Sequence, residues 1–394
     1  CEFHRARHCL FVWYGLLLFD QLFLSWHPHR IMATVSVLLC PCCARRYRTV
    51  YIRGDNRQKG NPYYEKGSAT IMLYIEKLKS KILSGELCTK EEVLCLYDQP
   101  FDELCEAANE IRKYFCSNQF DICTIINGKS GRCSENCKFC SQSSHHHAHV
   151  AEYPLLPAKK IIEDAKLNHE QGVLRYSIVT SGKRLSDIEI DAMCDVVKQI
   201  REQVGISVCI SFGLLNEVQY KRLKDAGATR VHNNLETSRR NFPNICTTHT
   251  FDDKIDAIRA AQSAGLTVCS GGIMGLGETW DDRIDMAFTL RELGIKSVPI
   301  NMLNPIPGTP FEKNEKLTNE DMRRIVAVYR FILPSASIRL AGGRGLFTDK
   351  GEACFLSGAN AAISGDMLTT DGITMEADMK LLKRLGYEAK LCNE

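Results

Sequence analysis

The sequence lacks three features that would place it in a specialised class of protein. Its most apolar stretch, residues 10–26, is shorter than the roughly 20 residues of a membrane-spanning helix and is broken by Asp20 and Gln21. Its formal net charge is only +3. Its 19 cysteines in 394 residues fall below the roughly 8–10% of a small disulfide scaffold. With 44% apolar and 25% charged residues, the composition is that of a globular protein.

The small positive charge is confined to the amino-terminal part of the chain. Residues 1–71 hold ten Lys or Arg against four Asp or Glu, whereas the remaining 323 residues hold 40 basic and 43 acidic side chains. A nucleic-acid-binding protein carries its basic excess in the folded body, where it can contact phosphates. We therefore expect no nucleic-acid partner and no membrane partner.

Residues 1–71 resemble an extension more than part of a folded body. Arg5 and Arg7 precede the apolar stretch as in a signal peptide, but no clear A-x-A cleavage site follows it. The many cysteines argue against an oxidising compartment and favour a reducing cytoplasm. We expect residues 1–71 to be non-native or disordered, with translation starting near Met72.

From Met72 onward the pattern predicts helices and then a regular alternation of strands and helices. Residues 72–120 read as N-terminal helices, with a capping box from Thr89 to Glu92 and a helix at 101–116. Strands are expected at 121–127, 174–180, 206–212, 229–234, 266–271, 297–302, 336–341 and 361–364. Helices are expected near 157–171, 186–204, 215–226, 252–264, 279–294, 317–332 and 373–386.

This alternation predicts an α/β fold, a (β/α)8 TIM-type barrel over residues 121–389, with residues 390–394 as a tail. An open doubly wound sheet is the alternative, but no G-x-G-x-x-G follows the first strand. In such a barrel the catalytic groups lie at the carboxyl ends of the strands.

Three cysteines follow the first expected strand closely. Cys133, Cys137 and Cys140 have the spacing C-x3-C-x2-C, and three thiolates so close together can hold an iron–sulfur cluster. Such a set leaves one iron of a 4Fe cluster open to an external ligand, as in a catalytic metal site. A zinc site completed by His145, His146 or His147 is the alternative, although the paired C-x-x-C hairpins of zinc knuckles are missing.

The triad resembles the signature of the radical S-adenosylmethionine enzymes, with Phe139 in the aromatic position. The longer string G-R-C-S-E-N-C-K-F-C-S-Q-S-S is similar to the biotin synthase family. Further similar strings are V-C-S-G-G-I-M-G-L-G-E-T (268–279), V-P-I-N-M-L-x4-G-T-P (298–310) and I-R-L-A-G-G-R (338–344). The resemblance runs from about Met72 to residue 389.

The resemblance implies a catalytic 4Fe–4S cluster on Cys133, Cys137 and Cys140, to which S-adenosylmethionine binds. A 5′-deoxyadenosyl radical then abstracts hydrogen from dethiobiotin, and a second cluster supplies the inserted sulfur. Phe139 is implied near the adenine, and the run from Gly271 through Ile273 to Glu278 resembles the adenine-binding strand end.

The resemblance also implies ligands for the second cluster, which is 2Fe–2S in the family. Cys209, Cys269 and Arg339 match three of its ligands. Ser177 stands where the family has its remaining cysteine, and a hydroxyl is a poorer iron ligand than a thiolate. Our hypothesis is that Cys246 substitutes, with an exposed loop cysteine as the alternative.

The remaining implied residues surround the substrate and S-adenosylmethionine. Asn234 keeps its position, and Glu236 replaces the carboxylate that would hold the ribose hydroxyls. Asn301 matches an asparagine that binds the ureido ring, whereas His232 departs from the family pattern. Each could instead bond its own loop.

Three readings of function remain open. The first is radical sulfur insertion, with a flavodoxin- or ferredoxin-type electron donor and a homodimer implied by the resemblance. The second is another radical enzyme, such as a hydrogenase-maturase-like or methylornithine-synthase-like protein. The third is a non-catalytic metal-binding module.

Overall fold

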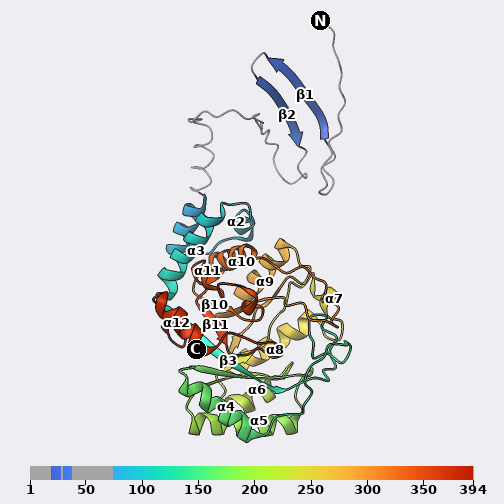
Figure 1. The fold of residues 1–394 in the computed structure, drawn as a ribbon, viewed down its shortest axis with the longest axis vertical. Helices are drawn as coiled ribbons and strands as arrows, with labels where there is room; N and C mark the ends of the chain where they lie inside the picture. The colour runs from blue at the N-terminus through green and yellow to red at the C-terminus, as the bar shows by residue number, and fades with distance from the viewer. Residues whose placement is uncertain (1–18, 28–29, 38–73, 394) are drawn as a thin grey trace. The chain divides into compact units, whose positions relative to one another are not determined.

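Eight parallel strands close into a barrel in the computed structural model, which describes residues 19–27, 30–37 and 74–393 (Figure 1). The barrel strands are β3 (Gln119–Lys129), β4 (Arg175–Thr180), β5 (Ser207–Ser211), β6 (Arg230–His232), β7 (Thr267–Cys269), β9 (Ser297–Met302), β10 (Ser337–Leu340) and β11 (Ala361–Ser364). Pairing of β11 with β3 and of β10 with β9 closes the ring. The short strands β8 (Gly272–Met274) and β12 (Glu388–Ala389) pair with β9 and β3. The predicted (β/α)8 barrel is confirmed.

Helices alternate with these strands as the periodicity predicted. They are α4 (Ala158–Glu170), α5 (Asp187–Gln203), α6 (Glu217–Asp225), α8 (Phe251–Ser263), α9 (Trp280–Glu292), α10 (Asn319–Ile332) and α12 (Met375–Arg384). The short helices α7 (Phe242–Ile245), α11 (Glu352–Phe355) and η1 (Arg344–Leu346) were not predicted. One turn or less carries too few residues to show a helical period.

Three helices precede the barrel: residues 74–83, α2 (Lys90–Leu94) and α3 (Phe101–Cys116). The expected capping box is present, because the Thr89 side chain accepts from the Glu92 amide and the Glu92 side chain accepts from the Thr89 amide. The first helix buries Ile75, Leu78 and Ile82, the face that the sequence pattern predicted.

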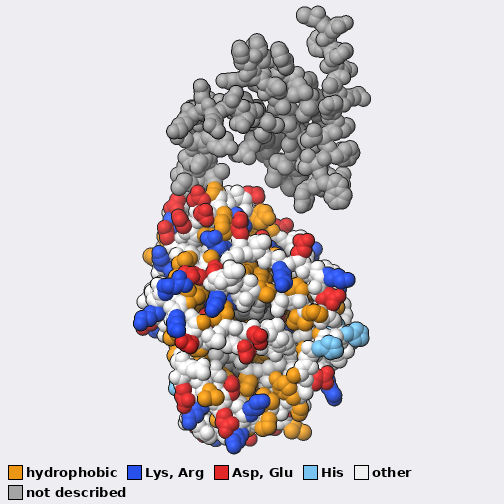
Figure 2. Space-filling view, viewed as in Figure 1, with side chains coloured by type: hydrophobic (Ala, Val, Ile, Leu, Met, Phe, Trp, Pro, Cys, Tyr) orange, Lys and Arg blue, Asp and Glu red, His pale blue; other side chains and the backbone are white. Residues whose placement is uncertain are grey.

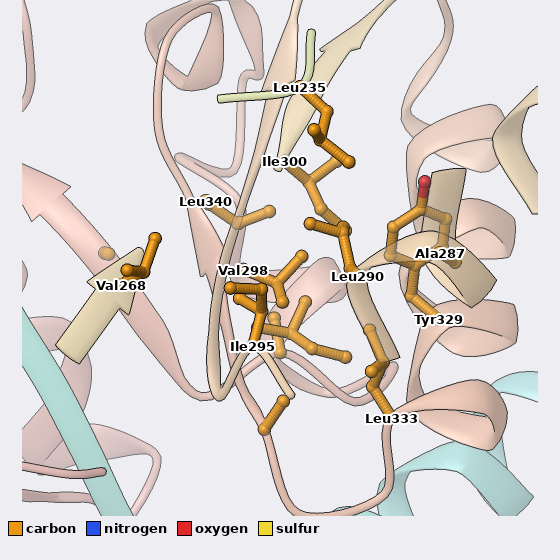
Figure 3. Packing of buried hydrophobic residues seen from close by; sticks show 14 of the residues in the cluster. Leu235, Val268, Ala287, Leu290, Ile295, Val298, Ile300, Tyr329, Leu333 and Leu340 are labelled. Carbon is orange, nitrogen blue, oxygen red and sulfur yellow. The ribbon is translucent and has the colours of Figure 1, made fainter. Parts of the chain in front are cut away.

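The barrel strands separate two environments by their alternation. Outward side chains such as Val298 and Ile300 of β9 pack against Leu290 of α9 and its neighbours (Figure 3). Residues between them, such as Pro299, face the barrel interior and line its cavity. The outer shell is therefore the main hydrophobic core, and the interior holds polar and sulfur-bearing side chains among apolar ones such as Ile125 and Ile363.

The amino-terminal segment is described only in part. The strands β1 (Phe19–His27) and β2 (Arg30–Val37) pair antiparallel with each other. The remaining residues up to 73 lie outside the described part, so the expectation of a non-native or disordered extension stays a prediction.

The helices and the charges of the described residues can be compared with those of membrane spans and basic surfaces. Among them, no helix combines the length and apolar character needed to cross a membrane. On the face shown in Figure 2, basic and acidic side chains of the barrel unit are interspersed. The two signs of charge are mixed on that face, so no continuous basic surface forms there.

Candidate active site

A cavity of about 400 Å³ runs from the cysteine loop into the barrel interior. At its mouth lie Phe139 and Cys140. Glu236 and Asn301 line its walls, and Arg339 lies with the inward side chains of the strands. This arrangement matches the expected location of a barrel active site at the carboxyl ends of the strands.

The loop that carries the triad is held by its own backbone. Cys133 donates its amide to Gln142 and accepts from the amide of Ser144, at 3.0 and 2.8 Å. The amide of Cys140 donates to the carbonyl of Cys137 at 2.9 Å. The three cysteines are half-buried, so the loop presents its thiols in a fixed turn instead of burying them as packing residues.

Ring nitrogens of two histidines after the triad contact backbone carbonyls. A ring nitrogen of His145 lies 3.0 Å from the carbonyl of Ser134, and one of His146 lies 3.0 Å from the carbonyl of Cys137. Because these nitrogens contact backbone oxygens, they favour a structural role over the alternative of a zinc site completed by either histidine.

Cys246 lies at the triad loop. Its Sγ accepts from the Cys137 thiol at 3.7 Å and lies 3.3 Å from Nδ1 of His249, which in turn lies 2.6 Å from Glu135. These hydrogen bonds lower the pKa of the Cys246 thiol to about 3, although burial opposes the charge. Cys246 does not line the cavity that Cys209 shares. Cys246 follows α7 at the mouth loop and does not lie beside Cys209, so this geometry does not support the hypothesis that it replaces the missing ligand, which stays a prediction.

Buried arginines gather around one carboxylate in the barrel interior. Asp121 of β3 is fully buried and lies 3.0 Å from Arg339, 3.3 Å from Arg175 and 3.6 Å from Arg230. Burial opposes ionisation of Asp121, but the three guanidinium groups hold its pKa below the usual value. One carboxylate does not neutralise even Arg230 and Arg339, so this region is suited to an additional anion.

Three thiols share the interior with these guanidinium groups. Cys123, Cys209 and Cys269 all line the cavity, as does Ser177. Burial raises the pKa of Cys123, and it raises that of Cys209 to about 12. Burial acts in the same direction on Cys269, but a hydrogen bond with His232 and nearby positive charges lower its pKa to about 6.

Two guanidinium nitrogens in this interior lack hydrogen-bond acceptors. Nη1 of Arg230 and Nη2 of Arg339 are buried and make no hydrogen bond, although each lies within ion-pair distance of Asp121. Unsatisfied buried donors are costly unless an acceptor is supplied. Sulfide-bearing anionic clusters supply acceptors and take thiolate ligands, so the residues present fit such a group.

Asn234 and Glu236 are hydrogen-bonded to each other at the wall of the cavity. The amide of Asn234 donates to Glu236 at 3.3 Å, and its carbonyl accepts from the amide of Gly271 at 3.1 Å. Glu236 has a left-handed backbone, with φ of 70°, which non-glycine residues adopt rarely. Hydrogen bonds with Gly271 and Ile273 hold its backbone in place. Burial raises the pKa of Glu236, against the opposing charge of Lys254.

The glycine run at the end of β7 is packed against neighbouring backbone. A Cβ on Gly271 would lie 1.9 Å from the carbonyl oxygen of Pro299, and one on Gly272 would lie 2.4 Å from that of Glu236. Glycine is thus required by neighbouring backbone. The Glu278 carboxylate accepts from the amide of Gly275, so it closes the following turn.

Asn301 uses its side chain to join two strand ends. It donates to the carbonyl of Gly272 at 3.0 Å and accepts from the amide of Gly342 at 2.8 Å. The residue lines the cavity, yet both ends of its amide already bond backbone groups. Neither partner belongs to the loop of Asn301 itself, so the structure does not show the own-loop alternative, and the contact with a ureido ring stays a prediction.

Sequence reasoning missed several cavity residues. Arg175 and Arg230 sit on expected strands and line the cavity, as does Lys254 from the start of α8. Asp121, on β3, is not part of the lining but lies buried beside these arginines. Cys123 was also missed as a site residue. Its signal was the alternation of β3, which places Asp121 and Cys123 on the same face.

Comparisons with known proteins agree with this site. The chain matches the Radical SAM superfamily over residues 128–290 and the Biotin and Thiamin Synthesis associated domain over residues 299–388. The first match implies a 4Fe–4S cluster and S-adenosylmethionine. In fold, the chain is similar to a methylornithine synthase, with a TM-score of 0.70 and 19% identity over 80% of this chain and 97% of that one. A maturase of the [FeFe]-hydrogenase gives a TM-score of 0.71 and 18% identity over 84% of this chain and 80% of that one.

Similarity in sequence is much higher to curated bacterial proteins. A biotin synthase of Brachyspira hyodysenteriae is 60% identical over 317 residues, which cover 80% of this chain and 95% of the relative. A biotin synthase of Akkermansia muciniphila is 55% identical over 320 residues, covering 81% of this chain and all of the relative. With the barrel, the cysteine loop and the thiol-lined interior, these matches show that the chain belongs to the biotin synthase family of radical S-adenosylmethionine enzymes.

Proposed function

We propose that this chain converts dethiobiotin to biotin by radical, S-adenosylmethionine-dependent sulfur insertion. The observation that carries the proposal is the single cavity that joins Cys140 of the triad loop to Cys209, Cys269 and Arg339 inside the barrel. A rearrangement enzyme needs the first set of thiols but has no use for the second. The relatives named biotin synthase support the same substrate.

In this proposal the triad Cys133, Cys137 and Cys140 holds the 4Fe–4S cluster. The backbone hydrogen bonds hold the loop together, and the Cys137 thiol would leave its contact with Cys246 to bind the cluster. Phe139, which packs half-buried against the core at the cavity mouth, would lie beside the adenine. A preformed loop lowers the entropy cost of assembling three ligands around one group.

S-adenosylmethionine would bind between the loop and the ends of β6 and β7. Glu236 would accept from the ribose hydroxyls, and Asn234 would orient it through their 3.3 Å hydrogen bond. The backbone at Gly271 and Ile273 would lie against the adenosine, because Ile273 lines the cavity beside Glu236. A buried carboxylate that lacks a charged hydrogen-bond partner of its own gains most from hydroxyl donors.

The substrate would lie deeper, between Asn301 and the interior thiols. Asn301 is already engaged by Gly272 and Gly342, so its contact with the ureido ring would use the remaining lone pair or follow a rotation of the amide. Cys209, Cys269 and Arg339 would hold the second iron–sulfur cluster. When bound, the two clusters supply the electron that cleaves S-adenosylmethionine and the sulfur that enters the product.

The proposal extends to partners and location. A flavodoxin- or ferredoxin-type protein would deliver the electron, and the chain would form a homodimer in the cytoplasm. The absence of disulfides among the described cysteines is compatible with a reducing compartment.

Anaerobic incubation with dethiobiotin, S-adenosylmethionine and a low-potential reductant tests the proposal. The expected products are biotin and 5′-deoxyadenosine, and Cys140→Ala should yield neither. Cys105→Ala, a buried helix cysteine outside the cavity, is the matched control and should keep both. Formation of 5′-deoxyadenosine without biotin would contradict the substrate and point to another radical enzyme.

A further inference from the structure

We propose that Cys123 of β3 is the third thiolate ligand of the second cluster and takes the place that Ser177 leaves open. This inference rests on the proposed function above and assigns a residue that the sequence pattern did not single out. It is carried by the register of the barrel, by contacts of Arg339, and by the lining of the cavity.

The register of the strands places Cys123 in one layer with the other ligands. In barrels of this kind, four side chains from alternate strands form each interior layer. From Cys123 the pairing runs through β4 to Ser207 on β5, two residues before Cys209. Each step thus follows the paired residues across two strands and then moves two residues toward the carboxyl end. The same step leads from Cys209 to Cys269, from Cys269 to Arg339, and from Arg339 back to Cys123.

These four residues thus occupy equivalent positions on β3, β5, β7 and β10. Three thiols and one guanidinium around a single layer are the ligand types implied for the second cluster. Ser177 lies on β4, between these strands, in the layer one residue nearer the carboxyl ends. By the same stepping, its layer contains His232, Pro299 and Ile363.

Contacts agree with the layer. Nη1 of Arg339 donates to Sγ of Cys123 at 3.1 Å, and Cys123 lines the same cavity as Cys209 and Cys269. A cluster that reaches the guanidinium group of Arg339 is therefore within reach of the thiol of Cys123. The same guanidinium also donates to the carbonyls of Asp121 and Ala362, which fixes it beside Cys123.

A packing role does not account for Cys123 as well. Hydrophobic residues of β3 such as Ile122 belong to the outer core cluster, whereas Cys123 faces the interior beside Arg339. A thiol next to a buried cation and an open cavity is in a different environment from packing cysteines such as Cys354, which belongs to that core.

Iron content of a chain without the triad tests the inference. In Cys133→Ala/Cys137→Ala/Cys140→Ala, reconstituted anaerobically with iron and sulfide, the iron, sulfide and visible absorption report on the second cluster alone. Adding Cys123→Ser should lower iron and sulfide at least about fivefold, since a hydroxyl is a poor ligand. Adding Cys105→Ala instead should leave both unchanged.

A variant in which the thiol is moved from position 123 to position 177 provides the decisive comparison. Cys123→Ser/Ser177→Cys in the same background should regain the cluster, because the thiol then returns from the adjacent layer. Full iron and an unchanged spectrum in the Cys123→Ser chain would overturn the inference. If the Cys123→Ser chain lacks native circular dichroism, the Cys123→Ser/Ser177→Cys chain decides. The inference is also overturned if this second chain folds without regaining iron, or does not fold.

A parallel biotin assay on the unmodified chain separates the two proposals. If the unmodified chain forms biotin and the Cys123→Ser chain keeps full iron, the proposed function stands and the role of Cys123 as a ligand is refuted. If the Cys123→Ser chain loses iron but the unmodified chain forms no biotin, the role of Cys123 as a ligand stands and the proposed substrate is refuted.

Discussion

Arg339 donates a hydrogen bond to the thiol of Cys123 at 3.1 Å, inside the barrel. The two residues come from strands at opposite ends of the barrel sequence, and β11 alone separates their strands in the sheet. Arg339 was expected at this site from the sequence, whereas Cys123 was not. It makes the interior a complete set of three thiols and one arginine, which the proposed sulfur chemistry requires.

Asp121→Asn should strongly destabilise the chain. Asp121 is the buried carboxylate shared by Arg230 and Arg339, and its loss leaves buried guanidinium charge without that partner. We expect the free energy of unfolding to fall by about 3–5 kcal/mol, as for other broken buried ion pairs. Urea denaturation measures this free energy of unfolding. The control is Asp187→Asn, which breaks an exposed ion pair and should change the free energy by less than about 1 kcal/mol. Equal small losses in both variants would contradict the role of Asp121.

Gly271→Ala should prevent the barrel from closing correctly. The new Cβ would lie 1.9 Å from the carbonyl oxygen of Pro299, on the neighbouring strand β9. We expect a loss of more than about 3 kcal/mol, because backbone must move to relieve the clash. The control is Gly345→Ala, whose new Cβ would lie 3.8 Å from its nearest neighbour, the carbonyl oxygen of Asp371. The melting temperatures of the two variants provide the measurement. A native melting temperature for Gly271→Ala would refute the close approach.

Asp282 should make stability depend on acid pH. Burial opposes its charge, but hydrogen bonds from Arg240, Ser238 and Thr279 hold its pKa below the usual value. Since the folded-state pKa is depressed, its contribution is present above the unfolded pKa of about 4 and is lost as the pH falls below it. Asp282→Asn should therefore be less stable than the unmodified chain at pH 7 by about 1–3 kcal/mol. The difference should shrink toward pH 3 in denaturation curves; a constant difference would argue against this linkage.

Cys246→Ala should leave the second cluster intact. The thiol lies 3.7 Å from that of Cys137, at the mouth loop, and outside the cavity lining around Cys209. In a chain without the triad, iron and sulfide should stay unchanged on adding Cys246→Ala. A fall in both would restore the hypothesis that Cys246 is an interior ligand.

The sequence was enough to predict the barrel and most of its elements. Alternating periods and capping residues such as Thr89 are local, and α3 was found with its predicted bounds. The resemblance supplied Cys209, Cys269 and Arg339, which the structure places along one cavity.

Residues whose meaning depends on register could not be predicted in the same way. Cys123 and Ser177 both lie on inward faces, and only strand pairing shows which one shares a layer with Cys209. Gly271 was interpreted through a ligand, although neighbouring backbone requires it. Cys246 lies 109 residues from Cys137 in sequence, and nothing local indicates that a loop brings them together.

Isotopic transfer of sulfur tests the central claim most directly. The chain is loaded anaerobically with iron and ³⁴S-sulfide, freed of excess sulfide, and given dethiobiotin, S-adenosylmethionine and a reductant for one turnover. Mass spectrometry of the product should show biotin carrying ³⁴S, because the interior cluster is the proposed sulfur source. Biotin with sulfur of natural isotopic abundance, or no biotin beside 5′-deoxyadenosine, would contradict the account.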